Sequence, residues 1–126
     1  MVPKESFSPE AWLRKGDVDL ESARVLLRED HATTAAFLLQ QALEKYLKGF
    51  LLSKGWALRK VHELDVLLND AVHYDKNLEK FRDLCETATE YYLAERYPYE
   101  EPVSVSKTEL EAQLRQAGLL REALRL

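Results

Sequence analysis

A run of basic side chains lies in the middle of an otherwise acidic sequence. Five lysines or arginines and no acidic residue lie between Lys45 and His62, whereas residues 63–101 hold eleven acidic and four basic residues. The net charge of −4 argues against broad, nonspecific coating of nucleic acid. A locally positive segment can still bind a single anion such as phosphate. Its basic residues are Lys45, Lys48, Lys54, Arg59 and Lys60.

His62 closes this basic run, directly after Arg59, Lys60 and one valine. A predicted helix begins at about His62, and the free backbone N–H groups of a helix start suit phosphate when basic side chains lie beside them. Lys48 would strengthen such a site if it points to the same place. The alternative interpretation is a capping histidine beside a solvated basic loop.

A third group places an arginine beside aromatic rings. Arg96 and Tyr97 are followed by Pro98 and Tyr99, and Tyr91 and Tyr92 stand about one helical turn earlier. A guanidinium with neighbouring tyrosines can hold a phosphate and stack a base. The alternative is a packed loop whose tyrosines cover the end of a helical bundle.

Polar residues also follow helical spacing within the second predicted helix. Gln41, Glu44 and Lys48 share one stripe, which we expect to lie opposite the main apolar face. One interpretation is a solvated stripe with a Glu44–Lys48 pair. The other is a polar site between two subunits, because Phe37 extends the stripe and Leu51 and Leu52 flank it.

Other catalytic chemistry has little support in this sequence. The three histidines lack metal-ligand spacing such as H-E-x-x-H, and neither a glycine-rich phosphate loop nor G-x-S-x-G occurs. Cys85 is the single cysteine, and its position on an apolar helix face predicts a core residue. We therefore expect no metal site and no cofactor.

Helices must position all of these residues, because good helix formers dominate the composition and Gly and Pro number only four each. Ser8 and Pro9 suit a helix start, Asp30 can cap the second helix, Gly55 suits its end, and residues 106–109 form a capping box. We predict an all-α, up-and-down bundle of about five helices in one domain, residues 1–126. The predicted helices span roughly residues 9–28, 31–54, 62–72, 75–94 and 107–124.

The second predicted helix is apolar on more than one side, which is typical of a central helix or of one that meets a partner chain. Nothing at the N-terminus resembles a signal peptide, and no apolar run approaches the roughly 18 residues of a membrane span. Together with the single cysteine, this predicts a cytoplasmic protein without a membrane association.

Several segments, taken in order, resemble the HEPN family. Residues 36–48, AFLLQQALEKYLK, are similar to the second-helix signature of prokaryotic HEPN proteins. Gly55 and then VHEL at residues 61–64 resemble the family's glycine-to-His-acidic-Leu segment. Arg-Tyr-Pro at residues 96–98 resembles the loop of one HEPN branch, and DLESA at residues 19–23 fits the first helix. The resemblance covers nearly the whole chain.

This resemblance implies a helical bundle that often dimerises and associates with nucleotides or RNA. Many HEPN proteins pair with a minimal nucleotidyltransferase in toxin–antitoxin-like systems, and others are ribonucleases with an Arg-x4-6-His motif from both subunits. The sequence departs from that nuclease motif. No histidine follows Arg96, Arg59 is too close to His62, and Arg24 and His31 fit the spacing only across the first helix and its loop.

We therefore favour a binding module over an enzyme: a homodimer that binds a nucleotide or phosphate and partners a minimal nucleotidyltransferase. One alternative is a metal-independent ribonuclease, with His62 as general acid or base and Arg96 or Lys48 stabilising the phosphorane. Another is a purely structural interaction protein. The residues expected to bind nucleotide or phosphate are Lys48, Arg59, Lys60, His62, Arg96 and Tyr97.

Overall fold

The chain folds into an all-α bundle, as predicted. A computed structural model describes residues 8–96 and 105–125, with side chains for 8–92 and 105–125, and no strand occurs within these ranges. A short 3-10 helix, η1, precedes the fourth α-helix. The elements are α1 (Pro9–Arg28), α2 (Ala32–Ser53), α3 (Leu64–Tyr74), η1 (Lys76–Phe81), α4 (Arg82–Arg96) and α5 (Lys107–Ala123).

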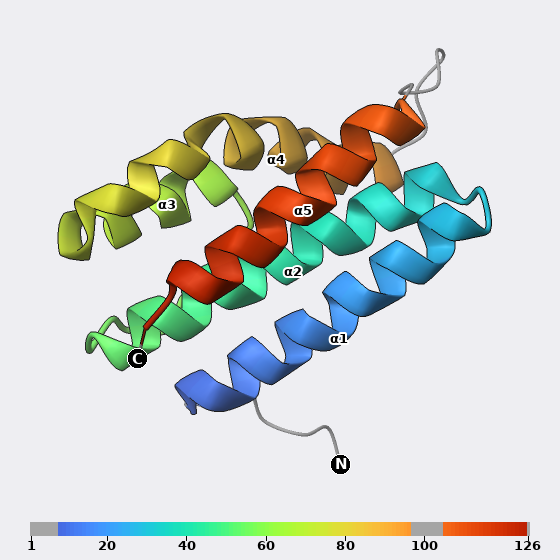
Figure 1. Ribbon diagram of the computed structural model, residues 1–126. Helices are drawn as coiled ribbons and strands as arrows, with labels where there is room; N and C mark the ends of the chain where they lie inside the picture. Colours follow the sequence, from blue (N-terminus) through green and yellow to red (C-terminus); the bar gives the residue numbers. More distant parts are fainter. Residues whose placement is uncertain (1–7, 97–104, 126) are drawn as a thin grey trace.

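The four long helices alternate in direction, and α3 lies within the connection from α2 to α4 (Figure 1). α2 runs through the middle and contacts α1, α3, α4 and α5. Most of its apolar residues are buried by the chain itself, including Leu51, which has no exposed surface, whereas Phe37, Leu38 and Leu52 are partly buried. The central position therefore accounts for an α2 that is apolar on more than one side.

Local sequence fixes most helix ends. The Ser8 side chain accepts a hydrogen bond from the Ala11 backbone N–H at 3.3 Å, and Ser106 accepts one from the Glu109 N–H at 3.1 Å. Gly55, with φ of +87°, follows the C-cap of α2. These starts and this end match the prediction. The expected Asp30 cap is wrong, because Asp30 adopts a left-handed conformation (φ 63°) and His31 is the N-cap residue, without a side-chain cap.

Two predicted helix starts also need correction. α3 begins at Leu64 with Glu63 as N-cap residue, so His62 precedes the helix instead of starting it. The residues after Asp75 form η1, and α4 begins only at Arg82. Residues three apart share one face of a 3-10 helix, and Leu78 and Phe81 are accordingly both buried. The predicted loop from Glu95 also begins later, because α4 continues to Arg96.

Residues 54–63 run back along α2 before α3 begins. At one end the Trp56 backbone N–H donates to the Leu51 carbonyl, and at the other the Gln40 side chain donates to the His62 carbonyl at 3.3 Å. Asp70 of α3 accepts from Trp56 Nε1 at 3.2 Å. This return segment therefore carries His62 from the C-terminal end of α2 to the level of Gln40, and α3 then runs parallel to α2.

Asp17 joins three helices on the other side of α2. Its Oδ1 accepts hydrogen bonds from the Tyr46 hydroxyl of α2 at 2.7 Å and from Arg121 Nε of α5 at 3.0 Å. Burial, followed by this hydrogen bond to Asp17, raises the pKa of Tyr46 well above its usual value. Tyr46 thus stays neutral and fixes the spacing of α1, α2 and α5.

Two glycines test how closely the helices pack. Gly16 of α1 lies against α2, and Gly118 lies on α5 near Arg24 of α1. A Cβ added at Gly16 would lie 2.6 Å from Tyr46 Cε1, whose ring is buried and tethered, so Gly16→Ala should lower the free energy of unfolding by about 1–3 kcal/mol. At Gly118 the nearest atom is Arg24 Nη2 at 3.4 Å, the end of a flexible side chain. Gly118→Ala should leave stability unchanged or raise it by up to about 1 kcal/mol. Urea unfolding measures both, and equal losses would contradict this account.

Candidate functional site

Polar residues are buried in the described chain at few positions, and most of them lie on α2. Gln40, Glu44 and Lys48 are 0%, 6% and 4% exposed, and Asp19 of α1 is also buried. Burying a charge costs free energy unless the charge is paired and hydrogen-bonded. The contacts of these side chains therefore define the candidate site.

Glu44 is the centre of this group. Its Oε2 accepts from Lys48 Nζ at 3.1 Å, and its Oε1 accepts from Gln40 Nε2 at 3.3 Å and lies 3.0 Å from His62 Nδ1. An ionised carboxylate only accepts hydrogen bonds, so Nδ1 carries a proton. In the neutral imidazole, Nε2 is then the acceptor, on a side chain that is 45% exposed.

The hydrogen-bonded network continues from Gln40 to α1. Gln41 Nε2 donates to Gln40 Oε1 at 2.7 Å, and Lys45 Nζ donates to Gln41 Oε1 at 3.3 Å. Lys45 also pairs with Asp19 Oδ2 at 2.6 Å, and Lys15 contacts the other oxygen of Asp19 at 3.2 Å. The polar stripe thus connects α1 to the return segment, and the charge of Lys45 is balanced by a buried carboxylate.

Three rings lie next to the buried carboxylate. His62 stacks on Tyr92 of α4 with centroids 4.9 Å apart and planes at 15°, and Tyr92 stacks on Phe37 of α2 at 6.4 Å and 27°. Phe37 and Tyr92 are half-buried. We call Phe37, Tyr92 and His62 the ring array. It joins α2, α4 and the return segment in one partly exposed aromatic surface.

The predicted phosphate ligands are only partly brought together. Lys48 is held in its ion pair with Glu44, and its ammonium lies 5.6 Å from the centroid of the Trp12 ring. The stripe of Gln41, Glu44 and Lys48 is therefore neither a solvated face nor a surface left open for a second subunit. It is largely buried inside one chain.

Arg59 lies away from Lys48. Its Nη2 pairs with Asp70 Oδ2 at 2.9 Å, and its guanidinium stacks over Trp56 at 5.2 Å. Lys60 is exposed on the same return segment. His62 belongs to both the basic run and the ring array, and it lies directly before Glu63, the N-cap residue of α3.

The aromatic group near Arg96 divides into two roles. Tyr91 is buried and its hydroxyl donates to Gln113 Oε1 of α5 at 2.9 Å, which is a packing contact. Tyr92 belongs to the ring array instead. α4 ends at Arg96, four residues after Tyr92. The Arg96 side chain and Tyr97 lie outside the described residues.

Gln40 and Trp12 are site residues that the sequence analysis missed. Gln40 interrupts apolar positions of α2 and stands four residues before Glu44, which itself stands four before Lys48. This ladder at i, i+4 and i+8 was visible in the sequence. Trp12 is 32 residues before Glu44, and only the packing of α1 on α2 brings it to Lys48.

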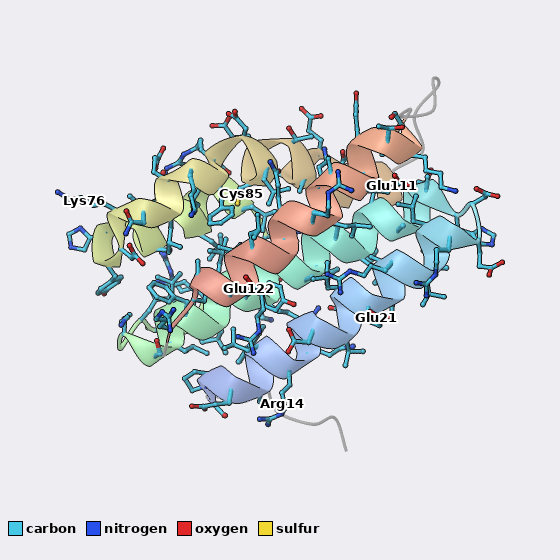
Figure 2. All side chains as sticks on the ribbon, viewed as in Figure 1. Arg14, Glu21, Lys76, Cys85, Glu111 and Glu122 are labelled. Carbon is cyan, nitrogen blue, oxygen red and sulfur yellow. The ribbon has the colours of Figure 1, made fainter. Side chains whose placement is uncertain are left out.

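Cys85 takes no part in the site. It lies on α4, and its side chain is buried in the bundle (Figure 2). Burial raises the pKa of its thiol to about 12, which leaves almost no thiolate near neutral pH. Within the described residues, no three His, Cys, Asp or Glu side chains are grouped so that they could hold a metal ion.

Comparison with known families decides the relationship. A family model, described as the HEPN domain, matches residues 9–126. The chain belongs to the HEPN family. The match covers all five helices, the buried polar network and the ring array. It confirms the resemblance found in the sequence. No curated protein and no solved structure matches the chain. In the described part of this HEPN chain, every helix is too short or too polar to cross a membrane.

The buried pair can be tested with a mutant cycle. Glu44→Gln leaves the Lys48 charge buried without a counter-ion and should lower the free energy of unfolding by about 3–5 kcal/mol. Glu44→Gln combined with Lys48→Met leaves no unpaired charge and should lose clearly less. Urea unfolding at neutral pH measures both.

The exposed pair of Lys107 and Asp30 is the matched control, and Lys107→Gln should change stability by less than about 1 kcal/mol. Equal losses in the single and double variants would contradict a buried, mutually dependent pair.

Proposed function

We propose that this HEPN protein binds a nucleotide at the ring array. The observation that carries the proposal is His62: its ring is held by Glu44, stacked on Tyr92 and still 45% exposed. Aromatic faces that are fixed in place stack nucleobases with little sequence preference, at about 1–3 kcal/mol per base. A ring locked before binding loses less entropy when the base arrives.

The geometry supports base stacking more directly than phosphate binding. Lys48 and Arg59 are each paired with a carboxylate, so neither offers a free charge to a ligand. Lys48 instead holds Glu44, and Glu44 holds His62. Other residues predicted to bind phosphate remain for this role. In our proposal, Lys60 of the return segment contacts the phosphates together with Arg96 and Tyr97.

We further propose that residues 1–126 act as one cytoplasmic domain, that the protein is a homodimer, and that it partners a minimal nucleotidyltransferase in a toxin–antitoxin-like pair. Membership of the HEPN family supports the homodimer, since HEPN domains often dimerise. The apolar side chains of α2 give a dimer little support, because the chain itself buries most of them. Exposed apolar residues occur on α1, α3 and α5, at Val18, Val25, Val66, Tyr74 and Leu119.

A specific observation also favours the ribonuclease alternative. Glu44 Oε1 lies 3.0 Å from His62 Nδ1, which is how a carboxylate orients an imidazole whose Nε2 then takes or gives a proton. His62 would act on the 2′-hydroxyl or the leaving oxygen of RNA. Under the purely structural alternative, the polar network would only tie α1 and the return segment to α2.

Nucleotide binding is tested by isothermal titration with ATP and other nucleotides at up to millimolar concentration. Tyr92→Leu removes the stacking surface, and His62→Asn removes the exposed ring. Each should weaken binding by about tenfold, the lower part of the range for one base–aromatic contact. His31→Asn is the matched control, since His31 is exposed in the turn between α1 and α2. The absence of any nucleotide binding would overturn the proposal.

RNA cleavage separates the two candidate functions. A ribonuclease would degrade RNA without added metal, and His62→Ala would abolish this while His31→Ala would not. Intact RNA after long incubation with pure, folded protein excludes the ribonuclease alternative. Light scattering and co-purification with a nucleotidyltransferase test the homodimer and the partner independently.

A further inference from the structure

A hollow of about 650 Å³ lies at the end of the bundle where α2 and α5 finish and η1 begins. Its wall includes the Phe50 ring and four cationic side chains from three parts of the chain. Lys54 is the C-cap residue of α2, Lys76 and Lys80 belong to η1, and Arg125 follows α5. We call this the cationic hollow. Figure 2 shows Lys76 at this end of the molecule, pointing away from the helices, and Glu111 near the opposite end.

These four cations differ from those of the candidate site because they have no acidic partner among the residues that the structure describes. Within the described chain, no ion pair involves any of them, whereas Lys45, Lys48 and Arg59 are each paired with a carboxylate. The single carboxylate in the wall is Asp75, whose Oδ1 accepts from the Asn77 backbone N–H at 3.0 Å. Four positive charges against one negative charge leave a strong local field.

Aromatic rings hold two of the lysines at the wall. Lys54 Nζ lies 5.3 Å from the centroid of Phe50, and Lys80 Nζ lies 5.3 Å from that of Phe81. Such cation–π contacts restrain the ammonium groups without neutralising them. Two of the four positive charges are therefore restrained at the wall of the hollow, where an anion with several charges would be attracted.

We propose that the cationic hollow binds an oligophosphate group. Lysine is a compact cation with three donors, and arginine can hold two phosphate oxygens at once. The volume lies in the range of small-molecule sites. Tyr74, 49% exposed at the edge of the hollow, offers a ring to a base if the oligophosphate belongs to a nucleotide.

This site is separate from the proposed nucleotide site. Phe37 of the ring array and Lys54 are 17 residues apart on α2, which is about 25 Å along a helix. One nucleotide cannot contact both. The inference therefore does not rest on the proposed function, and either can fail without the other.

The test uses tripolyphosphate, which has charge but no base. Isothermal titration in low salt, where the Debye length is about 30 Å, should detect binding, and the ligand should raise the melting temperature. Lys76→Gln combined with Lys80→Gln should weaken binding by about tenfold or more. The melting temperature of this variant without ligand should stay equal or rise, because repulsion is removed.

Lys107→Gln combined with Arg115→Gln is the control, since it removes the same charge from α5 at residues outside the hollow, Lys107 at the start of the helix and Arg115 at its middle. It should bind tripolyphosphate like the unchanged protein, and so should His62→Asn. No binding at millimolar tripolyphosphate, or an equal loss in the control, would overturn the proposal.

A further arm identifies the source of the oligophosphate. ATP is titrated into the His62→Asn protein, and the same titration is repeated with Tyr74→Leu added. If ATP binds more tightly than tripolyphosphate and Tyr74→Leu abolishes this difference in affinity, the hollow is assigned to nucleotides. Equal binding of the two ligands assigns it to the oligophosphate group alone. Both results support an oligophosphate site.

Discussion

The ion pair of Glu44 and Lys48 inside the bundle is the constraint on which the candidate site depends. Two buried charges must satisfy each other and their remaining hydrogen-bonding capacity without water. Glu44 does so through Gln40 and His62, and Lys48 lies under Trp12. The contact between Glu44 and His62 holds the return segment against α2. It also holds the His62 ring against Tyr92 of α4.

Charged residues that are close together in the sequence are separated in the fold. The basic run from Lys45 to His62 does not form one positive surface, because three of its five cations pair with carboxylates: Lys48 with Glu44 of the same helix, and Lys45 and Arg59 with carboxylates of α1 and α3. Lys54 instead joins Lys76 and Lys80, which come from the most acidic part of the sequence. Coulomb interactions depend on distance in space, so the charge of a linear segment says little about the surface to which it contributes.

Membership of the HEPN family places these features on a common helical bundle, but function depends on the particular site. In this protein the bundle presents a ring array that contacts a buried polar network through His62 and, about 25 Å away along α2, a hollow whose cations form no ion pair with the described residues. The first suits a flat base and the second suits a multiply charged phosphate. Both arise where segments distant in sequence meet on α2.

The sequence by itself determined the all-α bundle, the family and most helix ends. Ser8, Gly55 and Ser106 act within one turn of their own helix, so their effect is local and readable. Tertiary structure decided which polar stripe of α2 was buried, where His62 lies and which cations stay unpaired. The reason is physical: burial and pairing depend on what packs against a residue, and the turn of residues 54–63 back along α2 is not encoded in any local pattern.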